Sequence, residues 1–189
     1  MTSSEPTAPN DLDLTIDFVN TADFDRGEEA LSDPGALARW LSARGLLDDR
    51  ALITEEDLAA ALELREALRR TMLANNGADG DPGAAARLDQ AARRGELGVS
   101  FAAGAASLQP RAPGAAGALA AVLVPVAEAM ADGTWARVKA CRADDCQWAF
   151  YDFSRNRSGA WCDMAVCGNR EKVRAYRERS ARRHDDGAS

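Results

Sequence analysis

Four cysteines constrain the fold of this chain more than any other feature of its sequence. They stand as two pairs, Cys141 with Cys146 and Cys162 with Cys167, and the preceding 140 residues contain none. Four residues separate the members of each pair, and fifteen residues separate the pairs. This spacing suits a tetrahedral zinc ion, which four thiolates bind at about 2.3 Å. Because four sulfurs leave no open position for water, we expect one structural Zn²⁺ per chain.

Two other interpretations of the cysteines stay open, namely a thiol or disulfide switch and four inert side chains. The chain begins MTSSEPTAPNDLD, which lacks the basic and apolar segments of a signal peptide. We expect no run of about 18 apolar residues that could span a bilayer. We therefore expect a cytoplasmic protein without a membrane partner. A reducing compartment favours a metal over disulfides.

The residues around the cysteines have the pattern of a zinc ribbon. Residues 135–140 predict a strand that leads into the first cysteine, and the aromatic run 147–153 predicts a second strand. Gly168 follows the last cysteine and suits the tight backbone of a metal knuckle. Good helix formers continue from there to about Arg183. We therefore predict a four-cysteine zinc-ribbon-like module over residues 134–183 that ends in a basic helix.

The net charge of the chain changes sign at this module. Residues 1–133 contain 11 Lys and Arg against 22 Asp and Glu, whereas residues 134–183 contain 12 against 6. The first part therefore carries −11 and the second +6, although the whole chain has a net charge of −7. An acidic protein repels phosphate, so any contact with nucleic acid belongs to the second part.

The basic helix supplies the candidate contacts with DNA. Arg170, Arg174 and Arg177 lie on one stripe at helical spacing, where like charges repel one another unless they have a partner. Val173 and Tyr176 share another side and are expected to pack back on the ribbon. Such a helix can neutralise phosphates and reach guanine edges in the major groove. The candidate DNA-binding residues are Arg155, Arg157, Arg170, Lys172, Arg174, Arg177 and Arg179. Docking on a protein, or on the acidic part of the same molecule, stays open.

The first part of the chain has the pattern of helices. The clearest helix is expected over residues 54–75, where Thr54 can cap the first turn and Asn75-Asn76-Gly77 can end it. We predict a mainly α (α+β) fold, with a helical N-terminal domain over residues 11–133 that includes a small β-hairpin. Its other expected elements are helices over 32–46 and 84–94, a hairpin over 97–110 and an apolar helix over 117–130 kinked at Pro125. The apolar helix suits a monomer core or a homodimer interface. Residues 1–10 and 184–189 are expected to be tails.

The basic module resembles the CGNR zinc-finger family. The resemblance rests on the cysteine pairs and on the motifs WAFYD, SRN, WCDM and CGNR. Upstream, LTIDFVNTAD at residues 14–23, with ARWL and LELREAL, similarly resembles the ABATE domain, a proposed stress-induced transcription regulator. Members of the family often carry arginine just before the WC pair, where this chain has Gly159 and Ala160. We therefore expect one phosphate contact fewer.

Arg65 lies in the middle of the buried face expected for the helix over 54–75. An isolated buried charge is costly, so Arg65 needs a partner, and Asp17 or Asn20 is the expected one. Two roles stay open for this group. It is either an internal ion pair that joins two helices or part of a pocket for an anionic small molecule, with Asp17, Asn20 and Arg65 as the speculative ligand-binding residues.

Together, the residues and the resemblance predict a DNA-binding transcription regulator of a stress response. Its zinc finger would contact DNA through the basic helix, and its N-terminal domain would bind a small ligand. The alternative is a zinc-stabilised adaptor between proteins, or a thiol and zinc redox sensor, without direct DNA binding. We do not expect an enzyme, because four sulfurs close the metal site and no Ser/His/Asp or Cys/His set is readable.

Overall fold

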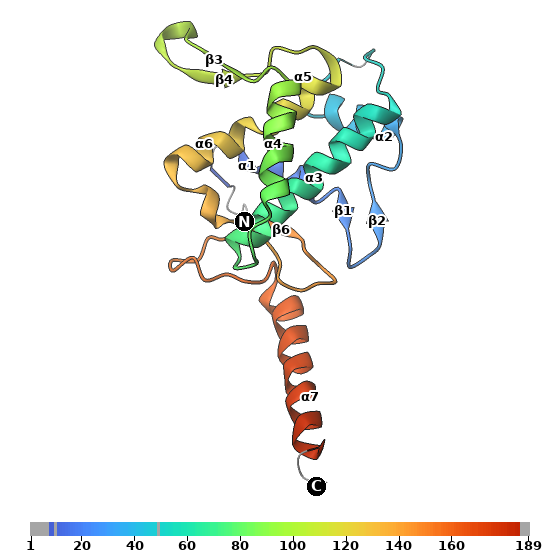
Figure 1. Cartoon of the computed structure of the whole chain (residues 1–189), viewed down its shortest axis with the longest axis vertical. Coiled ribbons are helices and arrows are strands. Elements are labelled where there is room, and N and C mark those ends of the chain that lie inside the picture. Colours follow the sequence, from blue (N-terminus) through green and yellow to red (C-terminus); the bar gives the residue numbers. More distant parts are fainter. Residues whose placement is uncertain (1–7, 10, 49, 186–189) are drawn as a thin grey trace, which may run out of the picture.

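The structure is a computed structural model that describes residues 8–9, 11–48 and 50–185, and the predicted tails lie mostly outside these residues. It is mainly α-helical with three two-stranded antiparallel sheets, as the sequence predicts. Figure 1 shows a helical body from which the last helix projects alone. The helices are α1 (Leu12–Val19), α2 (Pro34–Ser42), α3 (Glu55–Asn75), α4 (Pro82–Arg94), α5 (Gly114–Ala121), α6 (Val124–Asp132) and α7 (Asn169–Asp185). The strands are β1 (Ala22–Asp23), β2 (Glu28–Glu29), β3 (Gly98–Ser100), β4 (Ser107–Gln109), β5 (Val138–Ala140) and β6 (Ala149–Tyr151).

The long helix α3 forms where its end signals predict it. The Thr54 hydroxyl accepts a hydrogen bond from the Asp57 N–H at 3.2 Å, and the Asp57 carboxylate accepts one from the Thr54 N–H at 2.9 Å. This capping box satisfies backbone donors that a helix start otherwise leaves unpaired. The helix ends at Asn75, and the following Gly77 has a positive φ of 94°. The prediction of a helix over residues 54–75 is confirmed.

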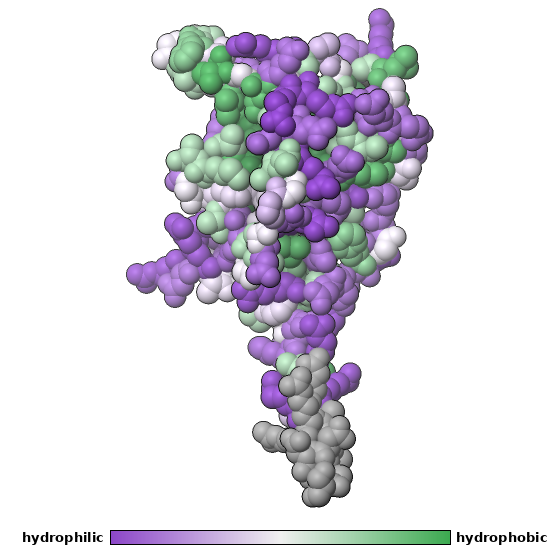
Figure 2. All heavy atoms as spheres, in the orientation of Figure 1, coloured by the Kyte–Doolittle hydropathy of each residue, from purple (hydrophilic) through white to green (hydrophobic). Residues whose placement is uncertain are grey.

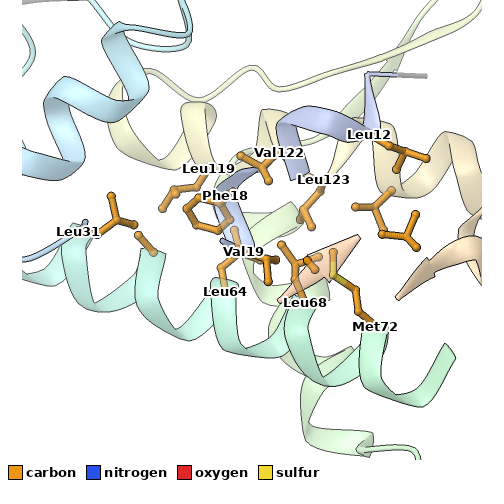
Figure 3. Close-up of a cluster of buried hydrophobic side chains, with 14 of the residues drawn as sticks. Leu12, Phe18, Val19, Leu31, Leu64, Leu68, Met72, Leu119, Val122 and Leu123 are labelled. Carbon is orange, nitrogen blue, oxygen red and sulfur yellow. The ribbon is translucent and has the colours of Figure 1, made fainter. Parts of the chain in front are cut away.

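The core lies where α3 meets α1 and the segment between α5 and α6 (Figure 3). Phe18 and Val19 of α1 are fully buried against α3. Leu68 and Met72 of α3 face this core, whereas Leu62 is only half-buried. The buried face of α3 also includes Leu64, Ala67 and Arg69.

The apolar segment after residue 113 forms two helices rather than one kinked helix. Val122 and Leu123 leave the helix, and Pro125 stands in the first turn of α6, where its missing N–H costs nothing. Residues 114–132 are nevertheless long enough and apolar enough on average to cross a membrane, although Glu128 interrupts the apolar run. This is weak evidence for a span, since buried core helices pass the same test and 56% of the window is buried here.

The shorter elements of the first part also follow their local signals. The Asp33 carboxylate accepts a hydrogen bond from the Ala36 N–H at 2.8 Å and caps α2. The predicted hairpin over 97–110 is present as β3 and β4, with Gly98 opposite Gln109. Its turn contains Gly104 at φ 77°, a conformation that glycine adopts without strain.

The hairpin of β5 and β6 packs into the helical core instead of standing apart from it. Val138, Ala140 and Ala149 are buried in the same cluster as the core residues of α1 and α3. Asn20 exchanges two hydrogen bonds with the Ala149 backbone, at 2.9 and 2.7 Å. Asn76 donates to the carbonyls of Ala140 at 2.7 Å and of residue 160 at 2.9 Å. These amides attach the cysteine-bearing segment to α1 and to the end of α3.

Arg69 adds a buried polar link between the same segments. Its side chain is 2% exposed, and it donates to the Val19 carbonyl at 2.8 Å and to the Gln147 carbonyl at 3.0 Å. The third nitrogen, Nε, lies 3.1 Å from the Glu66 carboxylate. One guanidinium therefore joins α3, the end of α1 and the loop that follows the second cysteine.

We expect the change Arg69→Leu to lower the free energy of unfolding by about 3 kcal/mol. It leaves two buried carbonyls without donors, and each costs about 1 to 3 kcal/mol. The adjacent change Arg70→Leu is the control, since the Arg70 side chain is 62% exposed and pairs only at the surface with Asp81. It should cost about 0.5 kcal/mol or less. Chemical unfolding of the full chain measures both, and equal losses would contradict the assigned link.

Candidate metal centre and its basic helix

The first cysteine pair is held by the turn that joins β5 to β6. The Cys141 N–H donates to the Trp148 carbonyl at 2.9 Å, which extends the pairing of the two strands by one step. The Cys146 N–H donates to the Ala143 carbonyl at 2.9 Å, and Gln147 has a positive φ of 49°. The chain thus folds back tightly enough to turn both sulfurs toward the same point.

The second pair lies around a single π-turn, Met164–Gly168, that leads into α7. Asp163 caps this turn, since its carboxylate accepts hydrogen bonds from the N–H groups of Ala165 and Val166. Any Cβ at Gly168 would collide with the Met164 sulfur and crowd the Trp161 ring. Close packing therefore explains the glycine, which the sequence had suggested only for the tight backbone of a metal knuckle.

The four sulfurs form one cluster with the dimensions of a zinc site. The sulfurs of Cys141, Cys146, Cys162 and Cys167 all lie within 4.8 Å of one another. The Cys146 and Cys162 sulfurs are 3.5 Å apart, and those of Cys162 and Cys167 are 3.7 Å apart. Four sulfurs bound tetrahedrally at 2.3 Å have edges of about 3.8 Å. The residues present therefore fit a four-coordinate metal, as their spacing in the sequence predicts.

Without a bound cation, the four thiols do not all ionise readily. A hydrogen bond from the Cys162 thiol, with backbone N–H groups of Cys162 and Ala143, lowers the pKa of Cys141 to about 5 against the effect of burial. Burial raises the pKa of Cys146 to about 12. The hydrogen bond with Cys141, and then burial, raise the pKa of Cys162 as well. One thiol ionises readily, so further thiolates need a bound cation.

Arg170 ties the cysteine cluster to the N-terminal β1–β2 hairpin. Its guanidinium lies 3.4 Å from the Cys167 sulfur, 2.7 Å from the Asp25 carboxylate and 3.3 Å from that of Asp145. The sequence assigns Arg170 to DNA, but these contacts place it at the base of α7 among acidic partners. Among the described residues its Nε is buried without a hydrogen-bond partner.

A buried ion pair fixes the turn between the two cysteine pairs. The Lys139 ammonium lies 2.7 Å from the Asp152 carboxylate, and these side chains are only 5% and 3% exposed. Lys139 also donates to the carbonyls of Arg157 and Gly159, at 2.7 and 2.9 Å. Asp152 accepts from the N–H groups of Ser154 and Gly159 at 2.9 Å. The pair therefore organises the loop on which Arg155 and Arg157 are exposed.

Helix α7 leaves the body, and its described residues pack mainly at its base, against the π-turn (Figure 1). The prediction that Val173 and Tyr176 pack back on the ribbon is wrong, because they are 49% and 66% exposed. Arg174 lies 2.8 Å from Glu171 and 4.0 Å from Asp144. In the part of the chain that the structure describes, three exposed cations of α7 make no ion pair, namely Lys172, Arg177 and Arg179.

The expected partners of Arg65 were wrong. Each of its nitrogens has a protein partner: Nη1 and Nη2 reach the Glu29 carboxylate at 2.7 Å, Nη1 also reaches the Thr21 hydroxyl, and Nε reaches Glu66 at 3.0 Å. Asp17 instead pairs with Arg44 at the surface. Arg65 is therefore an internal ion pair between α3 and the β1–β2 hairpin.

Sequence reasoning missed several side chains that position this region. Asn20 lies in the DFVN motif, but its role against the β6 backbone depends on a contact across 129 residues. Asn76 appeared only as a helix stop, although it holds the backbone on both sides of the first pair. Arg142 donates to the Asn76 carbonyl at 2.6 Å and completes this junction. The sequence offered one hint, namely that polar residues such as Asn20 and Asn76 stand at the ends of helices.

Comparison with known protein families gives two matches. Residues 12–133 match the ABATE model, described as "Putative stress-induced transcription regulator", and residues 137–180 match the CGNR zinc finger. The first match covers more than half of the chain, and the second covers the cysteine cluster and the exposed part of α7. None of the curated proteins compared with the chain matches it.

We expect the change Asp152→Asn to lower the free energy of unfolding at pH 7 by about 2.5 kcal/mol. Burial alone would raise the pKa of Asp152, but hydrogen bonds from Lys139, Ser154 and Gly159 outweigh it and lower the pKa to about 2. The unfolded value is about 3.9, and one pKa unit corresponds to about 1.4 kcal/mol.

The pH dependence tests the same assignment. Because the folded pKa of Asp152 lies below the unfolded one, its stabilisation is present above about pH 4 and disappears as the pH falls toward 2. The difference in stability between the wild type and Asp152→Asn should shrink over that range. The control is Asp144→Asn, since that side chain is 88% exposed. A constant difference from pH 7 to 2 would refute the assignment.

Proposed function

The chain belongs to the ABATE family and carries a CGNR zinc finger, and on this premise we propose that it is a DNA-binding transcription regulator of a stress response. In this proposal, zinc bound by the four cysteines fixes the base of α7, and α7 contacts DNA. The protein acts in the cytoplasm and binds rather than catalyses. The observation that carries the proposal is a basic helix that projects from an otherwise acidic molecule.

The shape and charge of α7 support a role in DNA binding. Its 17 residues span about 25 Å at 1.5 Å per residue, which is long enough to enter a major groove. Figure 2 shows mostly hydrophilic side chains where α7 leaves the body. The cations that have no acidic partner among the described residues, Lys172, Arg177 and Arg179, are free to meet phosphates.

The seven candidate DNA-binding residues then divide into two groups. Lys172, Arg177, Arg179 and the loop residues Arg155 and Arg157 are exposed and are proposed to contact DNA. Arg170 is proposed to fix the base of the helix, since its guanidinium already meets Asp25 and the Cys167 sulfur. Arg174 is proposed to join the DNA contacts once it leaves Glu171.

The proposed metal is one structural Zn²⁺, bound by Cys141, Cys146, Cys162 and Cys167. Zinc prefers tetrahedral thiolate sets, and the sulfur distances suit that geometry. When bound, the ion supplies positive charge and fixed geometry to the knuckle, and with four sulfurs it has no position for a substrate. An anionic ligand of the N-terminal domain and a homodimer stay predictions, and Arg65 no longer supports the ligand.

A protein partner is the second candidate function, and the exposure of Val173 and Tyr176 favours it. Apolar side chains at 49% and 66% exposure on a projecting helix are typical of surfaces that meet another protein. In that role the protein would be a zinc-stabilised adaptor. The affinity for the partner protein would depend on these two side chains. It would fall less steeply with salt concentration than an affinity for DNA.

Metal analysis tests the zinc site. We expect one zinc per chain in freshly purified protein, and a chelator that removes it should expose four titratable thiols and unfold the knuckle. The change Cys141→Ser should lower zinc content well below one per chain, whereas serine at a cysteine-free position of the same loop, Ala143→Ser, tests whether the loop itself tolerates substitution. Four titratable thiols in untreated protein would contradict the site.

The salt dependence of DNA binding tests the helix. Replacing Lys172, Arg177 and Arg179 together by Ala should flatten the slope of log affinity against log salt by up to about 0.9 per lost phosphate contact. The control replaces Arg87, Arg93 and Arg94, which are exposed on α4, so that the net charge changes equally. An unchanged slope in the α7 variant, or equal slopes in both, would favour the adaptor.

A further inference from the structure

Three of the four cysteines are buried, and solvent reaches the cluster at the fourth, Cys162. Cys141, Cys146 and Cys167 are 0%, 6% and 3% exposed, whereas Cys162 is half-buried. A groove of about 340 Å³ reaches the cluster there. Its lining includes Cys146, Cys162 and Cys167, together with carboxylates of both parts of the chain, Asp23, Asp25 and Asp163. A small reagent can therefore meet the cluster without unfolding the body.

The sulfurs that line this groove also differ in their neighbouring groups. The Arg170 guanidinium lies against the Cys167 sulfur. The Cys162 sulfur has other sulfurs as its neighbours. A charged donor withdraws electron density from a thiolate. Of the three cysteines that line the groove, Cys162 is the most exposed, and it lacks the guanidinium that lies against Cys167.

We propose that Cys162 is the site at which a neutral hydroperoxide oxidises this protein, and that the oxidised sulfur then closes a disulfide with Cys146. The inference rests on the zinc site of the proposed function but not on DNA binding. It commits to Cys146 because that sulfur lies 3.5 Å away and lines the same groove. The Cys167 sulfur is held by the charged Arg170, and Cys141 is fully buried and does not line the groove.

The two steps balance without any further redox partner. The Cys162 thiolate attacks one peroxide oxygen, the O–O bond breaks, and the products are a Cys162 sulfenic acid and hydroxide or alkoxide, which takes a proton from water. The Cys146 thiolate then attacks the Cys162 sulfur and expels hydroxide, which forms the disulfide. Two sulfurs are oxidised in total by two electrons, and one peroxide is reduced. The metal loses two of its four ligands, so zinc is released.

The groove favours a neutral oxidant over an anionic one. Three carboxylates and one guanidinium, that of Arg26, line it, which leaves an excess of two negative charges at its mouth. Like charge repels an approaching anion, whereas hydrogen peroxide carries no charge. We therefore expect a neutral alkyl hydroperoxide to release zinc from the zinc-loaded chain faster than a carboxylate-bearing hydroperoxide of similar size.

Mass spectrometry of the zinc-loaded full chain tests the site directly. Hydrogen peroxide is added below one equivalent in the presence of a dione that traps sulfenic acids, and released zinc is followed with a chromogenic chelator. We expect the first trapped sulfenic acid at Cys162 and, without the dione, one zinc released per Cys146–Cys162 disulfide. First modification at another cysteine, or a Cys162–Cys167 disulfide, would overturn the proposal. Zinc absent from untreated protein would instead overturn the metal site itself.

Two histidine variants test whether zinc release depends on oxidation of Cys162 itself or only on the loss of one thiolate ligand. Cys162→His and Cys167→His both keep four donors, since zinc accepts three thiolates and one imidazole. We expect at least tenfold slower peroxide-driven zinc release from Cys162→His, and a rate near that of the wild type from Cys167→His. Equal slowing of both variants would overturn the assignment. Where a variant does not bind zinc, the trapped position in the wild type decides.

Discussion

The buried guanidinium of Arg69 is the interaction on which the arrangement of this molecule depends. It stands 2% exposed on α3 and can be satisfied only where three separate segments meet: the end of α1, Glu66 of its own helix and the loop after the first cysteine pair. A buried charge without these partners would cost several kcal/mol, so competing arrangements of the segments are excluded. The helical body and the cysteine loop are consequently packed against each other, and are not merely joined by a linker.

The metal centre and the helical core therefore share one stabilising framework. The strands that carry the first cysteine pair are buried against α1 and α3, and asparagine side chains satisfy their edge backbone groups. The second pair contributes less to the core, since its π-turn contacts mainly α7. The helical body holds the first pair in place. Hydrogen bonds to the Ala160 carbonyl join the second pair to it, and the proposed zinc ion would add the direct link between the pairs.

Local signals in the sequence predict what local interactions decide. Short patterns predicted three structures correctly: the start of α3 from the capping box at Thr54, the β3–β4 turn from its glycine, and the sulfur cluster from the cysteine spacing. Partners distant in the chain were not predictable in this way. Arg65 meets Glu29 because the β1–β2 hairpin folds over α3, and nothing in the spacing distinguishes that glutamate from Asp17. The contact of Arg170 with Asp25 was unpredictable for the same reason, since the two residues lie 145 positions apart in the sequence.

The exposure of α7 carries a further consequence. A 17-residue helix with repelling arginines is marginal by itself in water when its described side chains contact the body mainly in the first two turns. What holds it are its first turn, the π-turn that bears Cys167 and the contacts of Arg170 with Asp25 and the sulfur. Loss of the proposed metal would loosen all three together, because each includes the second cysteine pair or its immediate neighbour. Order in the basic helix would then be coupled to the state of the four sulfurs, and through Asp25 to the N-terminal domain.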